Sequence, residues 1–197
     1  KPIRNAQLVR RALEYARSFG VPVAAHEEDL ELSDGGSMHE GAVSTRIGLR
    51  GIPTTAEEVM VARDVLLAEL TGGRLHICHV STSIALDLVR VAKRRDLAVT
   101  CEVAAHQFVL TDEDVAGANY DPNWKTNPPL RSAAEVEAVL QAIYDGTVDA
   151  IVSDHEPHHA DEKELDFSEA PFGIVGLETA VPLALDRLVH GRVIGLM

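Results

Sequence analysis

The sequence predicts an α/β protein in which helices cover a parallel sheet. Short apolar runs, each too short for a helix, alternate along the chain with longer stretches whose apolar residues recur at helical spacing. Helix start signals, mainly Asn, Ser or Thr, precede these stretches, and Gly often follows them. Such alternation is typical of strands joined by helical crossovers, which makes the strands parallel.

The first helix is expected over residues 5–19, with Asn5 as its N-cap. The apolar run 21–25 follows as a buried strand that ends at His26. Residues 27–53 are rich in Gly, Ser and charged residues without clear periodicity, which predicts a long excursion from the scaffold.

The same pattern then repeats to the end of the chain. We interpret Thr55 with Glu58, and Ser132 with Glu135, as capping boxes at two helix starts. Pro182 leaves the boundary of the last helix open. The expected elements are a helix from Thr55 to Gly72, a strand over 75–78, a helix capped by Ser81 or Ser83, a strand over 97–103, a helix over 132–146, a strand over 149–153 and a final apolar helix after Gly173.

Composition excludes several classes of protein. Of 197 residues, 46% are hydrophobic and 25% are charged, as in an ordinary soluble domain. The formal charge of −13 and the lack of a basic stripe argue against a nucleic-acid or anionic-membrane partner. Without a membrane-spanning run or a signal-peptide core, we expect a cytoplasmic protein. Cys78 and Cys101 lie in apolar runs and are expected to be buried thiols, not disulfide partners or metal ligands.

Three of the four predicted strands end in a potential metal ligand, namely His26, His79 and Asp154. The carboxyl ends of parallel strands meet at one edge, so these side chains are expected to gather there. Neutral imidazole and carboxylate are ligands that catalytic Zn²⁺ takes. The simpler reading is that polar residues collect where strands reach the surface. The shared placement of all three favours a metal site.

Five segments resemble the class I dihydroorotases of the amidohydrolase superfamily, and the resemblance runs along the whole chain. His-Val-Ser alone is a weak signal, whereas Asn-Pro-Pro-Leu-Arg followed by Ser-Asp-His-x-Pro-His and Gly-Leu-Glu-Thr is specific. The segments are Ala25–Asp29, His79–Thr82, Lys125–Arg131, Ser153–His158 and Pro171–Thr179.

This resemblance implies a (β/α)8 TIM-type barrel and a zinc-dependent cyclic amide hydrolase. The enzyme would use one or two zinc ions to interconvert N-carbamoyl-L-aspartate and dihydroorotate in pyrimidine biosynthesis. By motif, His26 and His79 would bind one zinc ion, and Asp154 would be both a ligand and the catalytic general acid/base.

The resemblance also implies substrate contacts at Asn127, His158, Phe172 and Gly173. Without it, Asn127 before Pro-Pro is better interpreted as a turn residue, and the histidines at 155, 158 and 159 as a solvated polar tract. His106 fits either support of the metal site or plain packing, and packing is favoured. The acidic stretch from 155 to 172 is longer than a connection needs and predicts a mobile lid or substrate loop.

The chain departs from the family in several ways. It has no His-x-His pair, and the family's bridging Asp or carboxylated Lys would precede Lys1. Ala104-Ala105-His106-Gln107 replaces the usual Thr-Pro-His-His, and Glu156 stands where a small residue is usual.

We therefore expect residues 1–197 to form a single partial domain, the C-terminal half of a barrel from its fourth to its eighth helix. It would have two open sheet edges and an uncovered apolar interior, and little or no activity alone. A piece of a longer protein is the favoured explanation, and a truncated homologue completed by another chain is the alternative.

Two other functions stay open. A hydantoinase or allantoinase would use the same chemistry, although the Asn-Pro-Pro-Leu-Arg segment favours dihydroorotase. A non-catalytic subunit that supports aspartate transcarbamoylase belongs to a different class, and the retained ligands argue against it. A small-molecule substrate and a homo-oligomer are expected, with aspartate transcarbamoylase as a further candidate partner.

Overall fold

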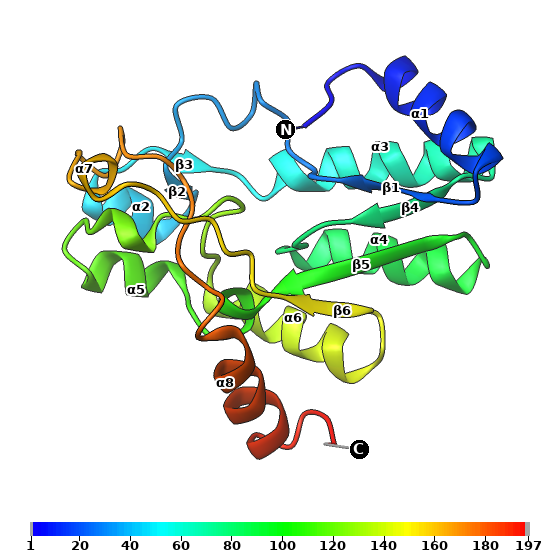
Figure 1. Cartoon of the computed structure of the whole chain (residues 1–197). Helices are drawn as coiled ribbons and strands as arrows, with labels where there is room; N and C mark the ends of the chain where they lie inside the picture. Colours follow the sequence, from blue (N-terminus) through cyan, green and yellow to red (C-terminus); the bar gives the residue numbers. More distant parts are fainter. Residues whose placement is uncertain (1, 196–197) are drawn as a thin grey trace.

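Four parallel strands form the central sheet (Figure 1). The structure is a computed structural model, and it describes residues 2–195. The strands lie in the order β1-β4-β5-β6, so each one pairs with its predecessor in this sheet. A doubly wound sheet would reverse its strand order, whereas a barrel adds strands consecutively. The strands are β1 (Pro22–Ala25), β4 (Arg74–Ile77), β5 (Val99–Ala104) and β6 (Ala150–Val152), within two residues of the predicted bounds.

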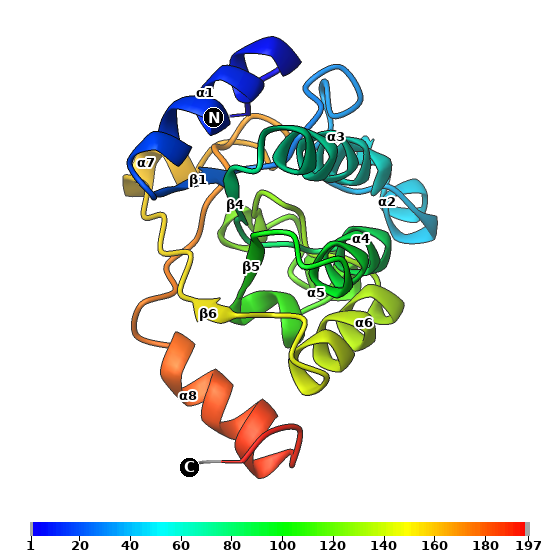
Figure 2. The same ribbon diagram turned by 90° about the vertical axis from the view of Figure 1, so that its right-hand side faces the viewer.

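Helices cover one face of this sheet (Figure 2). Leu75 and Ile77 on β4 and Val103 on β5 point into the layer between sheet and helices, where they are fully or almost fully buried. The helices of this layer are α3 (Thr55–Thr71), α4 (Ser83–Arg94) and α6 (Ala133–Tyr144), and α1 (Ala6–Ser18) packs beside α3 through Val9 and Leu13.

The other face of the two central strands is polar. His76, Cys78 and Glu102 are half-buried there, and Thr100 is exposed. The expectation of an uncovered apolar interior is therefore wrong for β4 and β5, because strand alternation sends their apolar side chains to the helices. The expected burial of both thiols is right for Cys101, which is fully buried, and wrong for Cys78.

The excursion over residues 27–53 has structure of its own. It packs at the carboxyl edge of the sheet with the segments that follow β5, around a small second core of Met38, Val43, Val115, Leu130 and Phe167. Its elements are β2 (Met38–His39), α2 (Ala42–Ile47) and β3 (Gly51–Ile52), and after β5 come η1 (Ala105–Phe108), α5 (Asp112–Gly117) and η2 (Pro122–Trp124).

The predicted capping arrangements at α4 and α6 are wrong. Thr82, not Ser81 or Ser83, caps α4, with its Oγ1 atom accepting from the Ala85 amide at 3.4 Å. Glu135 accepts from the Ser83 amide at 2.5 Å, so it does not close a box with Ser132. Its carboxylate is attracted to the positive N-terminus of α4, a favourable place for an anion.

The start of α3 also differs from its prediction. Its N-cap is Thr54, and Thr55 is already helical. The capping box of Thr55 with Glu58 therefore does not form, since the helix begins one residue earlier than the pattern implied.

The C-terminal region is helical, as predicted. Between β6 and α8, the polar stretch contains one short helix, α7 (Ala160–Lys163). Then α8 (Ala180–Ala184) continues into the π-helical segment η3 (Leu185–His190). Pro182 lies in the first turn of α8, where its missing N–H breaks no hydrogen bond. Within residues 2–195, no helix combines the length and the apolar character needed to span a membrane.

Candidate active site

The three predicted metal ligands meet at the carboxyl edge of the sheet. His26 follows β1, His79 follows β4 and Asp154 follows β6, and all three line one cavity of about 370 Å³. The Nδ1 atom of His26 lies 2.9 Å from the Nε2 atom of His79, with the two rings edge to face. The sequence predicted this convergence from strand ends alone, and the geometry brings the residues together.

Two of these three residues have strained backbones. His79 has φ +37° and Asp154 has φ +48°, in the left-handed region that side chains other than glycine seldom adopt. The Gln107 side chain holds the His79 turn, since its Nε2 atom donates to the His79 carbonyl at 2.8 Å and its Oε1 atom accepts from the Ala104 amide at 2.7 Å. Strain of this kind, about 1–3 kcal/mol per residue, is concentrated at functional sites.

Protonation states suit a metal site. Burial, with a smaller contribution from the neighbouring His26, lowers the pKa of His79 to about 3. Burial and then the charge of Glu156 raise the pKa of Asp154 to about 6. At pH 7 the site thus offers the neutral imidazole of His79 and the largely ionised carboxylate of Asp154. The Nδ1 atom of His26 faces the His79 ring nitrogen. These donors fit a zinc ion.

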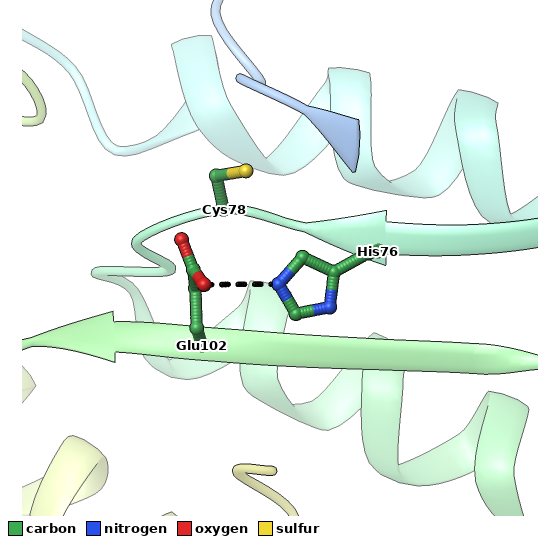
Figure 3. Close-up of side chains that lie close together, drawn as sticks. All are labelled: His76, Cys78 and Glu102. Atoms are coloured by element: carbon green, nitrogen blue, oxygen red, sulfur yellow. Dashed lines mark hydrogen bonds and ion pairs between the residues drawn. The ribbon is translucent and has the colours of Figure 1, made fainter. Parts of the chain in front are cut away.

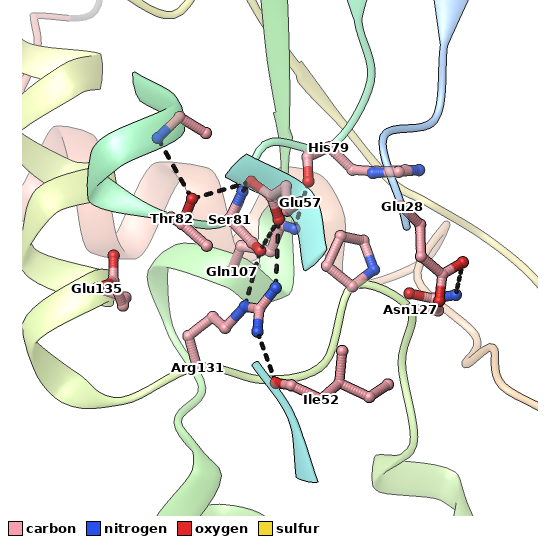
Figure 4. A network of polar contacts seen from close by, with 12 residues as sticks. Glu28, Ile52, Glu57, His79, Ser81, Thr82, Gln107, Asn127, Arg131 and Glu135 are labelled. Atoms are coloured by element: carbon pink, nitrogen blue, oxygen red, sulfur yellow. Dashed lines mark hydrogen bonds and ion pairs between the residues drawn. The ribbon is translucent and has the colours of Figure 1, made fainter. Parts of the chain in front are cut away.

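Glu28 orients His26, a role that the sequence did not reveal. The Glu28 Oε2 atom lies 3.2 Å from His26 Nε2. The same oxygen accepts from Asn127 Nδ2 at 3.2 Å (Figure 4). Burial raises the pKa of Glu28, but hydrogen bonds from His26, Ser33 and Asn127 outweigh it, and the net shift is downward. A proton on His26 Nε2 is thereby fixed toward Glu28, which leaves the Nδ1 lone pair for the site.

His106 lies beside Asp154. Its Nε2 atom is 3.9 Å from Asp154 Oδ2 and, among the described residues, has no hydrogen-bond partner. Burial lowers the pKa of His106 to about 4. His106 is buried, as the packing role requires, and its ring also faces Asp154, so the choice between packing and support of the metal site stays open.

The four predicted substrate contacts divide into two groups. Asn127 lines a wider opening of about 720 Å³ together with the metal-ligand candidates. His158 donates to the Phe172 carbonyl at 2.7 Å, and the Gly173 amide donates to the Lys125 carbonyl at 2.8 Å. His158, Phe172 and Gly173 do not line the cavities that contain His26, so their contact with substrate stays a prediction.

Lys125 fastens the predicted lid segment at its end. Its buried Nζ atom donates to the Ser168 and Ala170 carbonyls at 3.1 and 2.7 Å and lies 4.5 Å from the centre of the Phe172 ring. Burial and then the charge of Lys163 lower the pKa of Lys125 to about 8. The mobility of residues 155–172 stays a prediction, but their C-terminal end is anchored.

A buried charge network connects the loops around the site (Figure 4). Arg131 Nε donates to Ser81 Oγ at 2.9 Å, and Arg131 Nη2 pairs with Glu57 Oε2 at 3.3 Å. Glu57 in turn accepts from the Ser81 amide at 2.8 Å. The network joins the end of the Asn-Pro-Pro-Leu-Arg segment to α3 and to the turn after His79. It therefore positions Asn127 and His79 relative to each other.

The sequence is similar to curated proteins along almost its whole length. A model of the dihydro-orotase-like family matches residues 2–85. The protein named dihydroorotase from Anaeromyxobacter dehalogenans is 56% identical over 191 residues, which cover 97% of this chain and 44% of that protein. The dihydroorotase from Pelotomaculum thermopropionicum is 57% identical over 193 residues, covering 98% and 45%. The chain thus spans under half the length of these relatives.

Solved structures share the fold. The L-hydantoinase (dihydropyrimidinase) from Arthrobacter aurescens superposes with a TM-score of 0.85 at 23% identity, over 100% of this chain and 46% of that one. A dihydropyrimidinase from Brevibacillus agri gives 0.82 at 21% identity, over 98% and 43%. At such identities the likeness concerns the α/β amidohydrolase fold only. The assignment rests on the sequence matches alone: the chain belongs to the dihydroorotase-like family.

Proposed function

We propose that this chain supplies part of the active site of a zinc-dependent dihydroorotase, which interconverts N-carbamoyl-L-aspartate and dihydroorotate in pyrimidine biosynthesis. The observation that carries the proposal is the pair of ring nitrogens of His26 and His79, 2.9 Å apart, on the cavity that Asp154 also lines. Relatives named dihydroorotase, 52–57% identical to the chain, support the choice of reaction.

Each residue has a role that follows from its contacts. His26 and His79 would hold the zinc ion, and Glu28 keeps the His26 ring oriented. A bound zinc ion supplies Lewis-acid chemistry, which polarises the ring amide and acidifies water. The Asp154 carboxylate accepts a proton from the attacking water and returns it to the ring nitrogen that leaves. Asn127 stands at the opening, where its amide suits a substrate oxygen.

The same proposal includes a (β/α)8 barrel of which residues 1–197 form the C-terminal half, from its fourth to its eighth helix. Consecutive strand order and coverage of 44–45% of the relatives support it. The remaining ligands, a His-x-His pair and a bridging group, would come from the other half. We therefore expect little or no turnover from residues 1–197 alone.

Metal content tests the proposal directly. The chain should bind zinc, and His26→Asn or His79→Asn should reduce the bound amount as measured by atomic absorption. His190→Asn is the matched control, because His190 is exposed at the end of η3 and lines neither cavity that contains His26. Zinc content that is the same in all of these variants would contradict the assigned ligands.

A hydantoinase or allantoinase is the second candidate, favoured by the hydantoinase structures that share the fold. With the complete barrel, hydrolysis of dihydroorotate should exceed that of hydantoin or allantoin, and the reverse order would select this candidate. A scaffold for aspartate transcarbamoylase should lose no zinc when His26 or His79 is replaced, so the comparison of these variants with the unmodified chain also separates that role. A homo-oligomer and a cytoplasmic location remain expectations.

A further inference from the structure

A second group of potential ligands lies on the polar face of the sheet. His76 on β4, Cys78 just after it and Glu102 on β5 lie close together, and the side chains of His76 and Glu102 point toward each other (Figure 3). One ligand atom from each lies within 4.8 Å of the other two. The proposed catalysis uses none of these residues.

Strand pairing fixes the group in place. His76 is paired with Thr100 across β4 and β5, and the Ile77 and Cys101 pair follows. Cys78 and Glu102 come next along the two strands, on the same face as His76. Because the backbone ladder sets this spacing, the three side chains meet without depending on a flexible loop.

The His76 ring is already oriented for ligation. Its Nδ1 atom lies 2.8 Å from Thr100 Oγ1, and its Nε2 atom faces Glu102 Oε2 at 3.0 Å. A hydroxyl that holds one ring nitrogen directs the other toward a ligand, the usual arrangement around metal-binding histidines. Ligand atoms around tetrahedral zinc stand roughly 3.3–3.8 Å apart, so small side-chain rotations would close the site.

The surroundings favour a cation. Cys78 and Glu102 line the same cavity as His26, His79 and Asp154, and no Lys or Arg lines it in the described part of the chain. The cavity also contains Asp64, whose carboxylate is paired with Arg63 Nε at 2.6 Å, so its acidic character comes mainly from Asp154 and Glu102. A low-dielectric cavity lined by carboxylates attracts a divalent ion. Since all three ligands are only half-buried, water from the cavity can fill a fourth position.

We propose that His76, Cys78 and Glu102 form a binding site for a thiophilic divalent cation of the Zn²⁺ and Cd²⁺ class, separate from the site of His26, His79 and Asp154. Thiolate with imidazole is a soft to borderline donor set that selects such ions over Mg²⁺ or Ca²⁺. Binding replaces the proton of the Cys78 thiol, which passes to solvent. The thiolate and carboxylate charges then offset the two charges of the ion.

Cadmium gives a signal that only a sulfur ligand produces. Titration of the full chain with Cd²⁺ should generate the ultraviolet thiolate-to-cadmium absorption band. Cys78→Ser should abolish the band, whereas Cys101→Ser should retain it, because Cys101 is buried on the helix side of the sheet. His76→Ala and Glu102→Gln should each weaken Cd²⁺ binding at least tenfold, with circular dichroism confirming that the variants are folded.

Loss of the proposed catalytic ligands separates the two sites. The double variant His26→Asn with Asp154→Asn should keep the band, even if the proposed function is wrong. Absence of the band in the unmodified chain, or its persistence in Cys78→Ser, would overturn the inference. Unchanged affinity in both His76→Ala and Glu102→Gln would also overturn it, since the thiol would then bind without a built site. Loss of the cadmium band in the double variant would overturn the inference as well.

Discussion

The two regions around β4 are held together by different forces. On the helix side, Leu75 and Ile77 lie in an apolar core in which close packing excludes water. At the carboxyl edge, hydrogen bonds and buried charges around Glu57 and Arg131 fix the loops. The comparison indicates that apolar packing stabilises the helix side, whereas paired buried charges stabilise the edge and also set the relative positions of its reactive groups. Four predictions, from the largest expected effect to the smallest, test this division.

The largest effect is expected from Arg131→Met. The change leaves the Glu57 carboxylate buried without its cationic partner, which should lower the free energy of unfolding by about 3–5 kcal/mol. Urea denaturation measures it. Arg46→Met removes an ion pair with Glu113 that is exposed and should leave stability unchanged. Similar losses in both variants would show that the edge network has no special role.

Substitutions of two neighbouring residues on β4 allow the stability contributions of the two sheet faces to be compared directly. Ile77→Ala should destabilise the protein by about 2–5 kcal/mol, because it opens a cavity in the packed core. His76→Ala, on the polar face of the same strand, should cost clearly less, since its ring is only half-buried. Equal midpoint shifts in urea for these two variants would contradict the comparison.

Lys125 adds a pH dependence to the edge. Its folded pKa of about 8 lies below the ordinary value of about 10.4, so the unfolded state binds more protons between these values. Stability relative to Lys125→Met should therefore rise from pH 8 to pH 10.4, by up to about 1.4 kcal/mol per pH unit. Unfolding of both proteins along a pH series measures this difference. A difference that stays flat or falls would show that burial does not lower this pKa.

The smallest effect is expected from Glu28→Gln. It weakens the hydrogen bond that orients His26, and loss of such support typically lowers metal affinity about 10–100-fold. Competition with a chromogenic zinc chelator would report the change. Glu31→Gln is the control, because Glu31 is exposed at the surface of the same excursion. Equal zinc affinities in the two variants would show that Glu28 does not support the metal site.

Local pattern predicted the elements of the fold well, and it predicted that the three candidate ligands lie together. Apolar periodicity located the strands and helices, and the residues after each strand identified His26, His79 and Asp154. These features depend on neighbours in sequence, so the sequence alone can reveal them.

Contacts between distant segments escaped prediction. Glu135 matched the pattern of a capping box, yet its carboxylate binds the N-terminus of another helix. Glu28 and His76 gain their roles from partners across loops or strands, and no spacing rule anticipates such partners. The polar nature of the open sheet face was also missed, although the alternation of Leu75, His76 and Ile77 along β4 is a local signal for it.

The backbone conformations of His79 and Asp154 create a trade-off between stability and metal binding at these two positions. Glycine would relieve the strain at either one, so a search for more stable variants should favour it there. Such variants would gain thermal resistance by giving up the ring nitrogen or the carboxylate. Directed evolution for stability alone should therefore erode this site first, whereas selection that also requires metal binding should leave both residues untouched.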